Sequence, residues 1–333
     1  MIFPRHNISI YLLLVLGFNS YAFSKNNTTK IAFWNVENLF DLVDDSLKND
    51  EDFLIGAKKN VTQDSYNLKL ENLSKVINNI NSDIIGLCEV ENYFMFEELS
   101  RKLKIVYDIV HYESPDRRGI DVGVLYNKNK VRLIESEPIE VVLPNGNPTR
   151  DILYLKFQKD IFFFHLYVNH WPSKYGGVKK TIPLRISAAQ TLRNHIDDIL
   201  AINSDSEIIV IGDLNDEPND LSVLNHLKAS IDFSDDFKNN YDLFNMMMPW
   251  HRNPKGSTYT YAGIHMVYDH IILSKGLLDK KGLKYVKNSV GVYDGDEYRQ
   301  HGGKYDGYPY RFWAGNRILG GYSDHMPVFI SIE

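Results

Sequence analysis

From residue 31 to the end of the chain, short apolar runs alternate with segments whose apolar residues recur at helical spacing. Runs of about four to eight residues rich in β-branched and aromatic side chains predict strands, and apolar spacings of about three or four predict amphipathic helices. Helices are predicted at Ser65–Asn79, Phe94–Leu103, Leu184–Ile199 and near Leu221–Ala229. Strands are predicted at Ile31–Trp34, Ile84–Cys88, Val106–His111, Val122–Tyr126, Val131–Glu137, Ile152–Phe157, Phe162–Asn169, Ile208–Ile211, Tyr259–Tyr261, His270–Ser274 and Val328–Ile332.

Two stretches carry neither pattern. Residues 41–60 are acidic and are predicted to be a loop, and residues 291–322 form a long segment dense in Tyr, Gly and Arg. An irregular segment of that length is uncommon in a compact domain and is often functional. No repeat and no Gly/Pro-rich linker divides the chain after residue 30, so we expect one domain over residues 31–333. Many strands with helices between them indicate an α/β fold of two packed sheets with helices outside.

The first 22 residues have the pattern of a signal peptide. A short polar region around Arg5 precedes the apolar run Ile8–Phe18, and Ser20-Tyr21-Ala22 has small residues where a signal peptidase reads. The alternative is a membrane anchor, but this run is shorter than the roughly 20 residues of a spanning helix. We therefore expect cleavage after Ala22, a linker over residues 23–30, and a periplasmic or secreted protein without a stable membrane anchor.

Composition narrows the function classes. Of the 333 residues, 44% are hydrophobic, which is enough to form a large core. The net charge of −6 argues against tight, charge-driven binding of nucleic acid. Cleavage of nucleic acid stays possible, because metal ions can neutralise phosphate locally. The single cysteine, Cys88, excludes an internal disulfide and lies in an apolar run, so we expect a buried thiol. We expect a monomer and predict no partner protein.

Acids, amides and histidines recur where the predicted strands end. Carboxylate and amide oxygens suit a hard cation, so the pattern indicates Mg²⁺ or Mn²⁺, with Ca²⁺ also compatible. Zinc fits poorly, because there is no cysteine pair and no two histidines stand at helical metal-ligand spacing. Taken singly, each acid is more typical of a surface position or a cap than of a metal site, and only their recurrence at strand ends favours the metal site. The polar residues that stand at these strand ends are Asn35 and Glu37, Glu89, Asp213 and Asn215, and Asp324 with His325.

Two histidines are candidates for stabilising a charged phosphorus centre. His325 lies in Ser323–Pro327 directly before the last strand, and His170 follows the strand ending at Asn169. A buried catalytic imidazole needs an orienting carboxylate. We expect Asp269 to serve His325 and Asp121 to serve His170. The alternative for His170 is a structural residue of the turn that it begins.

Covalent hydrolysis and nucleotide-fold chemistries have little support. Gly320-Gly321-Tyr322-Ser323 lacks the closing glycine of a nucleophile elbow. The chain has no Walker A loop and no Gly-rich dinucleotide fingerprint after a strand. Metal-assisted attack by water is therefore the better-supported class.

In their order along the chain, these motifs resemble those of the endonuclease/exonuclease/phosphatase superfamily, which has the DNase I-like fold. The likeness covers roughly residues 30–333, and its motifs are specific together although each is weak alone. The motifs are Asn35-Val36-Glu37, Leu87–Glu91, Asn169–Pro172, Gly212–Asn215, Asp269 and Ser323–Pro327.

The resemblance implies a four-layer α-β-β-α sandwich of two packed mixed sheets and a Mg²⁺-dependent phosphoesterase. It implies that Glu89 holds the metal, with Asn35, Glu37 and Asp324 close by. It further implies that Asp213 orients or deprotonates the attacking water and that Asn215 positions it. His325, backed by Asp269, and His170 would stabilise the pentacoordinate centre.

The resemblance leaves the substrate open, because function depends on the site rather than the fold. Residues 291–322 carry eight aromatic side chains and three arginines able to stack bases and hold phosphates, but the tyrosines also suit a packed cover loop. Lys174, Lys179, Lys180 and Arg185 could add phosphate contacts. We expect a nuclease-like phosphodiesterase.

Three alternatives stay open. A phosphomonoesterase is compatible with the same motifs. A sphingomyelinase-like phospholipid phosphodiesterase is disfavoured, because no purely apolar exposed hairpin is found in the sequence. An inactive binding protein is disfavoured too, because the chain keeps both Glu89 and the pair Asp324–His325.

Overall fold

A computed structural model describes residues 28–232, 243–279 and 281–333 of the chain. The expected signal peptide, residues 1–22, and most of the expected linker lie outside the described residues. The linker prediction is wrong at its end, because strand β1 (Thr29–Leu39) already pairs Lys30 with Ser331. Within the described ranges, no helix has the length and apolar character needed to cross a membrane.

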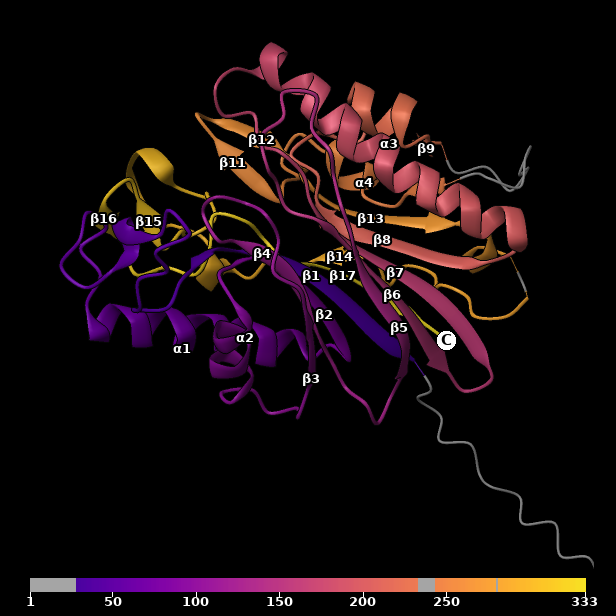
Figure 1. Ribbon diagram of the computed structural model, residues 1–333, viewed down its shortest axis with the longest axis horizontal. Helices are drawn as coiled ribbons and strands as arrows, with labels where there is room; N and C mark the ends of the chain where they lie inside the picture. Colours follow the sequence, from indigo (N-terminus) through magenta and orange to yellow (C-terminus); the bar gives the residue numbers. More distant parts are fainter. Residues whose placement is uncertain (1–27, 233–242, 280) are drawn as a thin grey trace, which may run out of the picture.

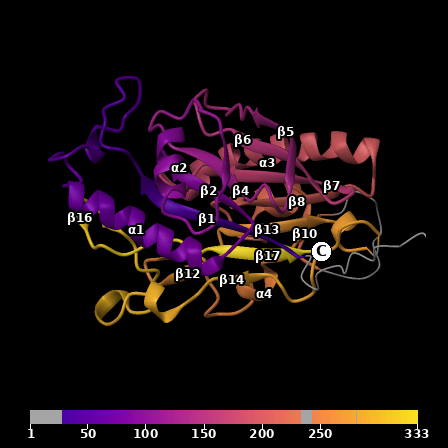
Figure 2. The ribbon, with the colours of Figure 1, turned by 90° about the horizontal axis from the view of Figure 1, so that it is seen from below.

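Two mixed sheets pack face to face (Figure 1). The six-stranded sheet contains, in spatial order, β14 (Gly291–Val292), β17 (Val328–Ile332), β1, β2 (Ile84–Val90), β4 (Asp121–Tyr126) and β3 (Asp108–His111). The seven-stranded sheet contains β5 (Arg132–Ile139), β6 (Ile152–Lys159), β7 (Phe162–His170), β8 (Glu207–Asp213), β13 (Asp269–Ser274), β10 (Leu243–Asn245) and β9 (Ala229–Ser230). Figure 2 shows β17 beside β1, although these strands come from opposite ends of the chain.

Helices cover the outer faces of both sheets. On the six-stranded sheet lie α1 (Gln63–Ile80) and α2 (Tyr93–Ser100), and on the seven-stranded sheet lies α3 (Val178–Ile202) (Figure 1). Helix α1 begins at a capping box between Thr62 and Ser65 and ends at Asn81, whose left-handed conformation stops the helix. The predicted α-β-β-α layering is therefore confirmed.

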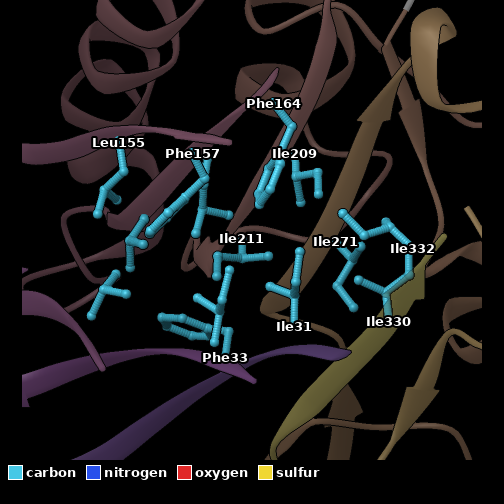
Figure 3. Close-up of a cluster of buried hydrophobic side chains, with 14 of the residues drawn as sticks. Ile31, Phe33, Leu155, Phe157, Phe164, Ile209, Ile211, Ile271, Ile330 and Ile332 are labelled. Atoms are coloured by element: carbon cyan, nitrogen blue, oxygen red, sulfur yellow. The ribbon is translucent and has the colours of Figure 1, made fainter. Parts of the chain in front are cut away.

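Alternation along β1 explains how one strand serves two cores. Ile31 and Phe33 belong to the cluster between the sheets, shown in Figure 3, whereas Ala32 and Trp34 belong to the cluster under α1 and α2. Successive side chains on a strand point to opposite faces, so a strand covered on both faces reads as one continuous apolar run. At Gly86 the sheets approach so closely that a Cβ atom would lie 3.0 Å from Ile211 Cδ1.

Some predicted elements differ from the structure. Helix α3 begins at Val178 rather than Leu184 and includes Pro183. The helix predicted near Leu221–Ala229 is one π-helical turn, Ser222–His226, which ends where Lys228 adopts a positive φ and the chain enters β9. The expected loop over residues 41–60 is irregular apart from the 3-10 turn Glu51–Phe53.

The long segment 291–322 is folded into short elements rather than one open loop. It contains 3-10 turns at Asp296–Tyr298 and Gly303–Tyr305 and a two-stranded ribbon of β15 (Trp313–Ala314) and β16 (Arg317–Ile318). A second ribbon, β11 (Tyr259–Tyr261) with β12 (Ile264–Met266), lies at the same end of the molecule (Figure 1). The ribbon β11–β12 flanks the polar site formed at the strand ends.

The core between the sheets gives a direct stability test. Ile211 is 0% exposed and Ile202, at the end of α3, is 89% exposed. Ile211→Ala should lower the free energy of unfolding by about 2–5 kcal/mol, because it leaves a cavity between the sheets. The matched change Ile202→Ala should stay within about 0.5 kcal/mol in urea denaturation. Equal effects of the two changes would contradict this packing.

Candidate active site

Strands from both sheets bring their ends to one place. In the seven-stranded sheet, His170 pairs with Asp213 across the parallel strands β7 and β8, and Asp269 pairs with Asp213 across the antiparallel strands β8 and β13. The same register that aligns the apolar residues therefore gathers three ionisable groups at one edge. The six-stranded sheet adds residues from β1, from β2, and from the turn before β17.

Backbone irregularities aim several of these side chains. The pairing of β1 with β2 shifts register between Asn35 and Leu39, and the pairing of β2 with β4 shifts between Cys88 and Val90. Glu37 and Glu89 lie in these bulges with φ of 54° and 62°, a region that residues with a Cβ seldom adopt. Each such residue costs of order 1–3 kcal/mol, which neighbouring contacts must offset. Strain of this kind clusters at functional sites.

Asp213 lies at the centre of the site. Its Oδ2 accepts a hydrogen bond from Asn35 Nδ2 at 3.1 Å, and Nε2 of His170 and of His325 lie 3.8 and 3.7 Å from the same oxygen. Its Oδ1 accepts the backbone N–H of Asn215 at 2.9 Å. The buried carboxylate thus faces two imidazoles and is held by donors from both sheets.

Burial, with the nearby charge of Asp269, raises the pKa of Asp213 to about 7, against the opposing effect of His325 and two hydrogen bonds. A carboxylate with a pKa near neutrality can accept a proton from water and release it again. General bases work best when their pKa is close to the working pH.

His325 is held as a cation. Its Nδ1 lies 2.7 Å from Asp269 Oδ2, and its ring stacks on Tyr259 with centroids 4.7 Å apart. Burial lowers the pKa of His325, but the carboxylates of Asp269 and Asp213 outweigh burial and raise it well above its ordinary value. Since Nδ1 is engaged by Asp269, Nε2 is the nitrogen free to donate toward a ligand. The pairing expected from the sequence is present in the structure.

His170 has the opposite electrostatic setting. Burial, then the cationic Arg150 and Arg118 and the neighbouring His325, lower its pKa well below 6.5, so the ring is neutral. Arg150 also donates to the backbone oxygen of His170 at 3.2 Å, which fixes the end of β7. His170 Nδ1 is buried and has no hydrogen-bond partner among the described residues.

The expected pairing of His170 with Asp121 is wrong. Asp121 lies 3.0 Å from His111 Nε2 and accepts the backbone N–H of Ser114, so its carboxylate is turned toward the edge strand β3. The sequence places Asp121 at the mouth of a strand but does not say to which neighbour its side chain turns. That choice depends on the pairing of β4 with β3.

Two of the four predicted metal-site residues present carboxylates to a cavity of about 700 Å³, which His170, Asp213 and His325 also line. Glu89 has one oxygen bonded to the Asn38 N–H at 3.0 Å and another 3.4 Å from Asn35 Nδ2. Asp324 is bonded through Oδ2 to Arg311 at 2.7 Å. Carboxylate oxygens beside a buried base are the donor chemistry that a hard divalent cation requires, so the residues present fit such an ion.

The other two predicted metal ligands do something else. Asn35 Oδ1 accepts the Glu37 N–H at 3.0 Å, which turns its amide nitrogen toward Glu89 and Asp213, so it donates rather than coordinates. Glu37 accepts the backbone N–H groups of Phe312 and Trp313 at 2.6 and 3.1 Å. The prediction of Glu37 as a metal ligand is therefore corrected: its carboxylate is taken up in holding the segment 291–322.

Sequence reasoning missed several residues of the site. Arg118 lines the cavity, and its guanidinium pairs with Asp116 at 3.2 Å. The backbone of Asn38 donates to Glu89, and the ring of Tyr259 stacks on His325. No local sequence motif marks Asn38 or Tyr259. Arg185, a candidate phosphate contact in the sequence, is instead fully buried and pairs with Asp216 at 2.7 Å.

An exposed hairpin, which the sequence pattern did not reveal, is present in the structure. Tyr261 pairs with Ile264 across β11 and β12, both are 62% exposed, and both line the cavity mouth. Tyr175 and Val178 add exposed apolar surface to the same rim. In the sequence, His265 interrupts the apolar pattern of this hairpin. Successive side chains on a strand point to opposite faces, so His265 points away from the face that carries Ile264.

Comparison with known proteins agrees with this arrangement. A sequence profile described as the Endonuclease/Exonuclease/phosphatase family matches residues 30–333. A search of curated proteins gave no match.

Several solved structures share the fold. A humanised D. rerio TDP2 with 14 mutations is 16% identical, with a TM-score of 0.58 over 92% of this chain and 100% of that one. The human Nocturnin catalytic domain is 15% identical, with a TM-score of 0.54 over 92% and 94% of the two chains. An endonuclease/exonuclease/phosphatase family protein from Bacteroides thetaiotaomicron is 14% identical, with a TM-score of 0.59 over 92% and 94%. At these identities the likeness concerns the fold.

The pairing of His325 with Asp269 predicts a titration shift. In metal-free protein, Asp269→Asn should lower the pKa of His325, because burial lowers this pKa and the Asp269 carboxylate that raises it is removed. NMR titration of the imidazole would measure the change. His325 keeps its proton to higher pH in the folded state than in the unfolded chain, so the stabilisation is present below about pH 6.5 and is lost as pH rises through the folded pKa. Asp121→Asn, which alters an equally buried carboxylate beside His111, should leave the His325 titration unchanged. An unshifted His325 in Asp269→Asn would refute the pairing.

The corrected role of Glu37 predicts a structural effect. Glu37→Gln should lower the free energy of unfolding by about 1–3 kcal/mol, because the Glu37 carboxyl group accepts one backbone N–H on each oxygen and an amide offers only one acceptor oxygen. Limited proteolysis should then cut within residues 291–322 faster than in wild type. Glu71→Gln, on the exposed face of α1, is the control. The assignment fails if the two variants unfold and digest alike.

Proposed function

Because this chain belongs to the Endonuclease/Exonuclease/phosphatase family, we propose that it is a divalent-metal-dependent phosphodiesterase that cleaves nucleic acid by attack of water. The observation that carries the proposal is the setting of Asp213, a base with both imidazoles within 4 Å of one carboxylate oxygen. The carboxylates of Glu89 and Asp324 line the same cavity. Export is part of the proposal and rests on the sequence of residues 1–22.

Glu89 and Asp324 would hold the ion, with Mg²⁺ or Mn²⁺ the best match to their oxygens. When bound, such an ion neutralises phosphate charge and makes water more acidic. Asn35 and Asn38 keep the Glu89 carboxylate in place through hydrogen bonds from the Asn35 amide and the Asn38 backbone.

The side chains around Asp213 supply the proton chemistry. Asp213 accepts a proton from the attacking water, whose oxygen forms the new bond to phosphorus as the bond to the leaving oxygen breaks. Asn215, whose amide nitrogen donates to Trp171 O at 3.0 Å, has its Oδ1 available to align that water. His325 as a cation and His170 as a neutral donor direct Nε2 toward the developing charge on the phosphoryl oxygens.

A structural neighbour supports the choice of nucleic acid among phosphate esters. One structure with this fold, a D. rerio TDP2 16% identical with a TM-score of 0.56, was solved in complex with a single strand DNA product. Within this chain, aromatic and basic side chains of residues 291–322 line a cavity that shares Asp324 with the site.

A phospholipid phosphodiesterase is the second candidate, and a specific feature favours it. The rim formed by Tyr261, Ile264, Tyr175 and Val178 presents exposed apolar surface next to the cavity. Apolar side chains at the mouth of a site can enter a lipid interface and bring a head group to the catalytic residues. Lys174, which lines the same cavity, makes this rim less apolar than a dedicated membrane hairpin.

Hydrolysis of bis(4-nitrophenyl) phosphate, plasmid DNA, RNA and sphingomyelin vesicles tests these functions. We expect cleavage of the small ester and of nucleic acid with Mg²⁺ or Mn²⁺, and none in EDTA. Asp213→Asn and His325→Ala should each lower kcat by about 10²–10⁴-fold, since each removes a proton-transfer or charge-stabilising group. Asp198→Asn, an exposed acid on α3, is the control.

Undiminished cleavage in Asp213→Asn would place the activity elsewhere and overturn the proposal. Cleavage of sphingomyelin without cleavage of nucleic acid would select the second candidate.

A further inference from the structure

A second cavity of about 740 Å³ lies next to the catalytic one. We call it the loop chamber; its walls are the hairpin β11–β12 and the segment 291–322, with Thr260, Lys304, Tyr305, Tyr308 and Arg317 among its lining residues. Tyr261 and Asp324 line both cavities. The two spaces therefore meet at these two residues rather than lying on separate faces.

The hairpin separates the two spaces. Tyr259 lines the catalytic cavity, Thr260 lines the loop chamber, and Tyr261 lines both, as alternation along β11 requires. At the tip, a Cβ atom on Gly263 would lie 3.9 Å from the Tyr308 hydroxyl, so the hairpin reaches the segment on the far wall. A ligand that fills both cavities must pass beside Tyr261 and Asp324.

The wall of the loop chamber is fixed to the catalytic framework. Arg311 donates to Asp324 at 2.7 Å and to Glu37 at 3.3 Å, and Glu37 also binds the backbone of Phe312 and Trp313. Glu37 and Asn35, which donates to Asp213, are both on β1. The chamber is thus held in a constant position relative to Asp213, which suits a preformed subsite.

The lining favours a planar, charged ligand. Tyr305 is 48% exposed and meets Tyr308 edge to face, with centroids 5.5 Å apart, so about half of its side-chain surface is accessible to a ligand. Arg317 is exposed, and its side chain makes no ion pair or hydrogen bond within the described ranges. Lys304 lies 5.5 Å from the Tyr305 ring centroid. Aromatic faces with adjacent cations bind a base and its phosphate, whereas an acyl chain needs a more aliphatic wall.

We propose that the loop chamber binds the nucleotide next to the scissile phosphate of a single-stranded nucleic acid, with the base on Tyr305 and the flanking phosphate at Arg317. This inference rests on the proposed function and names its substrate class. A base can lie on a tyrosine only when it is unstacked from its neighbours, which favours a single strand over a duplex. The chamber volume falls in the range of about 300–1,000 Å³ typical of ligand sites.

Kinetics with long and short substrates test the subsite. The substrates are a ten-residue single-stranded oligonucleotide and methyl 4-nitrophenyl phosphate, which is too short to fill both cavities. Tyr305→Ala should lower the ratio of kcat/KM for the oligonucleotide to that for the small ester by about tenfold, the loss typical of one stacked base. Arg317→Ala should lower it by a similar factor, because it removes a charged hydrogen bond to the flanking phosphate.

Matched controls lie at the far end of the seven-stranded sheet. Phe163→Ala removes a 43% exposed aromatic ring near the start of β7, and Arg132→Ala removes an exposed arginine of β5. Neither should change the ratio. An unchanged ratio in Tyr305→Ala and Arg317→Ala overturns the subsite, and so does loss of sphingomyelin hydrolysis with oligonucleotide cleavage intact.

A binding assay separates failure of the subsite from failure of the proposed function. If the small ester is not hydrolysed with Mg²⁺ or Mn²⁺, the proposed function fails, but anisotropy of a labelled oligonucleotide still reports on the chamber. In an Asp213→Asn background, adding Tyr305→Ala or Arg317→Ala should weaken binding about tenfold. Equal binding with and without these changes would show that the chamber holds no nucleotide.

Discussion

The buried carboxylate of Asp213 is the constraint around which the rest of the site is arranged. An ionised carboxylate in an apolar interior is costly unless donors and opposite charge accompany it. Here the donors come from Asn35 on the other sheet and from the Asn215 backbone, and the charge comes from His325. The hydrogen bond from Asn35 crosses between the sheets, so the site can form only when the two sheets are correctly packed.

This arrangement also sets the two histidines apart. His325 has Asp269 behind it and carries a proton, whereas His170 has Arg150 behind it and stays neutral. The two imidazoles that face the same Asp213 oxygen therefore differ in charge, because Asp269 contacts one histidine and Arg150 contacts the other. Oppositely tuned groups of this kind let a single site align one proton acceptor with a charged donor and a neutral donor.

The segment 291–322 combines two roles that looked like alternatives in the sequence. Tyr298 is buried in the cluster under α1 and α2, and Phe312 and Trp313 are buried in a small cluster with Val61, while Tyr305 and Arg317 line the loop chamber. Glu37 joins these roles, because its carboxylate holds the buried part of the segment and thereby places the exposed part. Since many activities share this fold, such additions to the scaffold are where substrate choice is expected to lie.

The sequence by itself determined the layered α/β architecture and which residues stand at the strand ends. Apolar periodicity and turn chemistry are local, so the amino-acid sequence alone suffices to name Asp213, Asn215, Asp269 and His325 as a site. Their partners were decided only by tertiary structure. Asn35 meets Asp213 across 178 residues and Arg311 meets Glu37 across 274, and nothing local specifies either contact. The same holds for Asp121, whose side chain contacts His111 rather than His170, and for Tyr261, which lines two cavities. The direction of a side chain depends on which strands pair, and strand pairing depends on the whole chain.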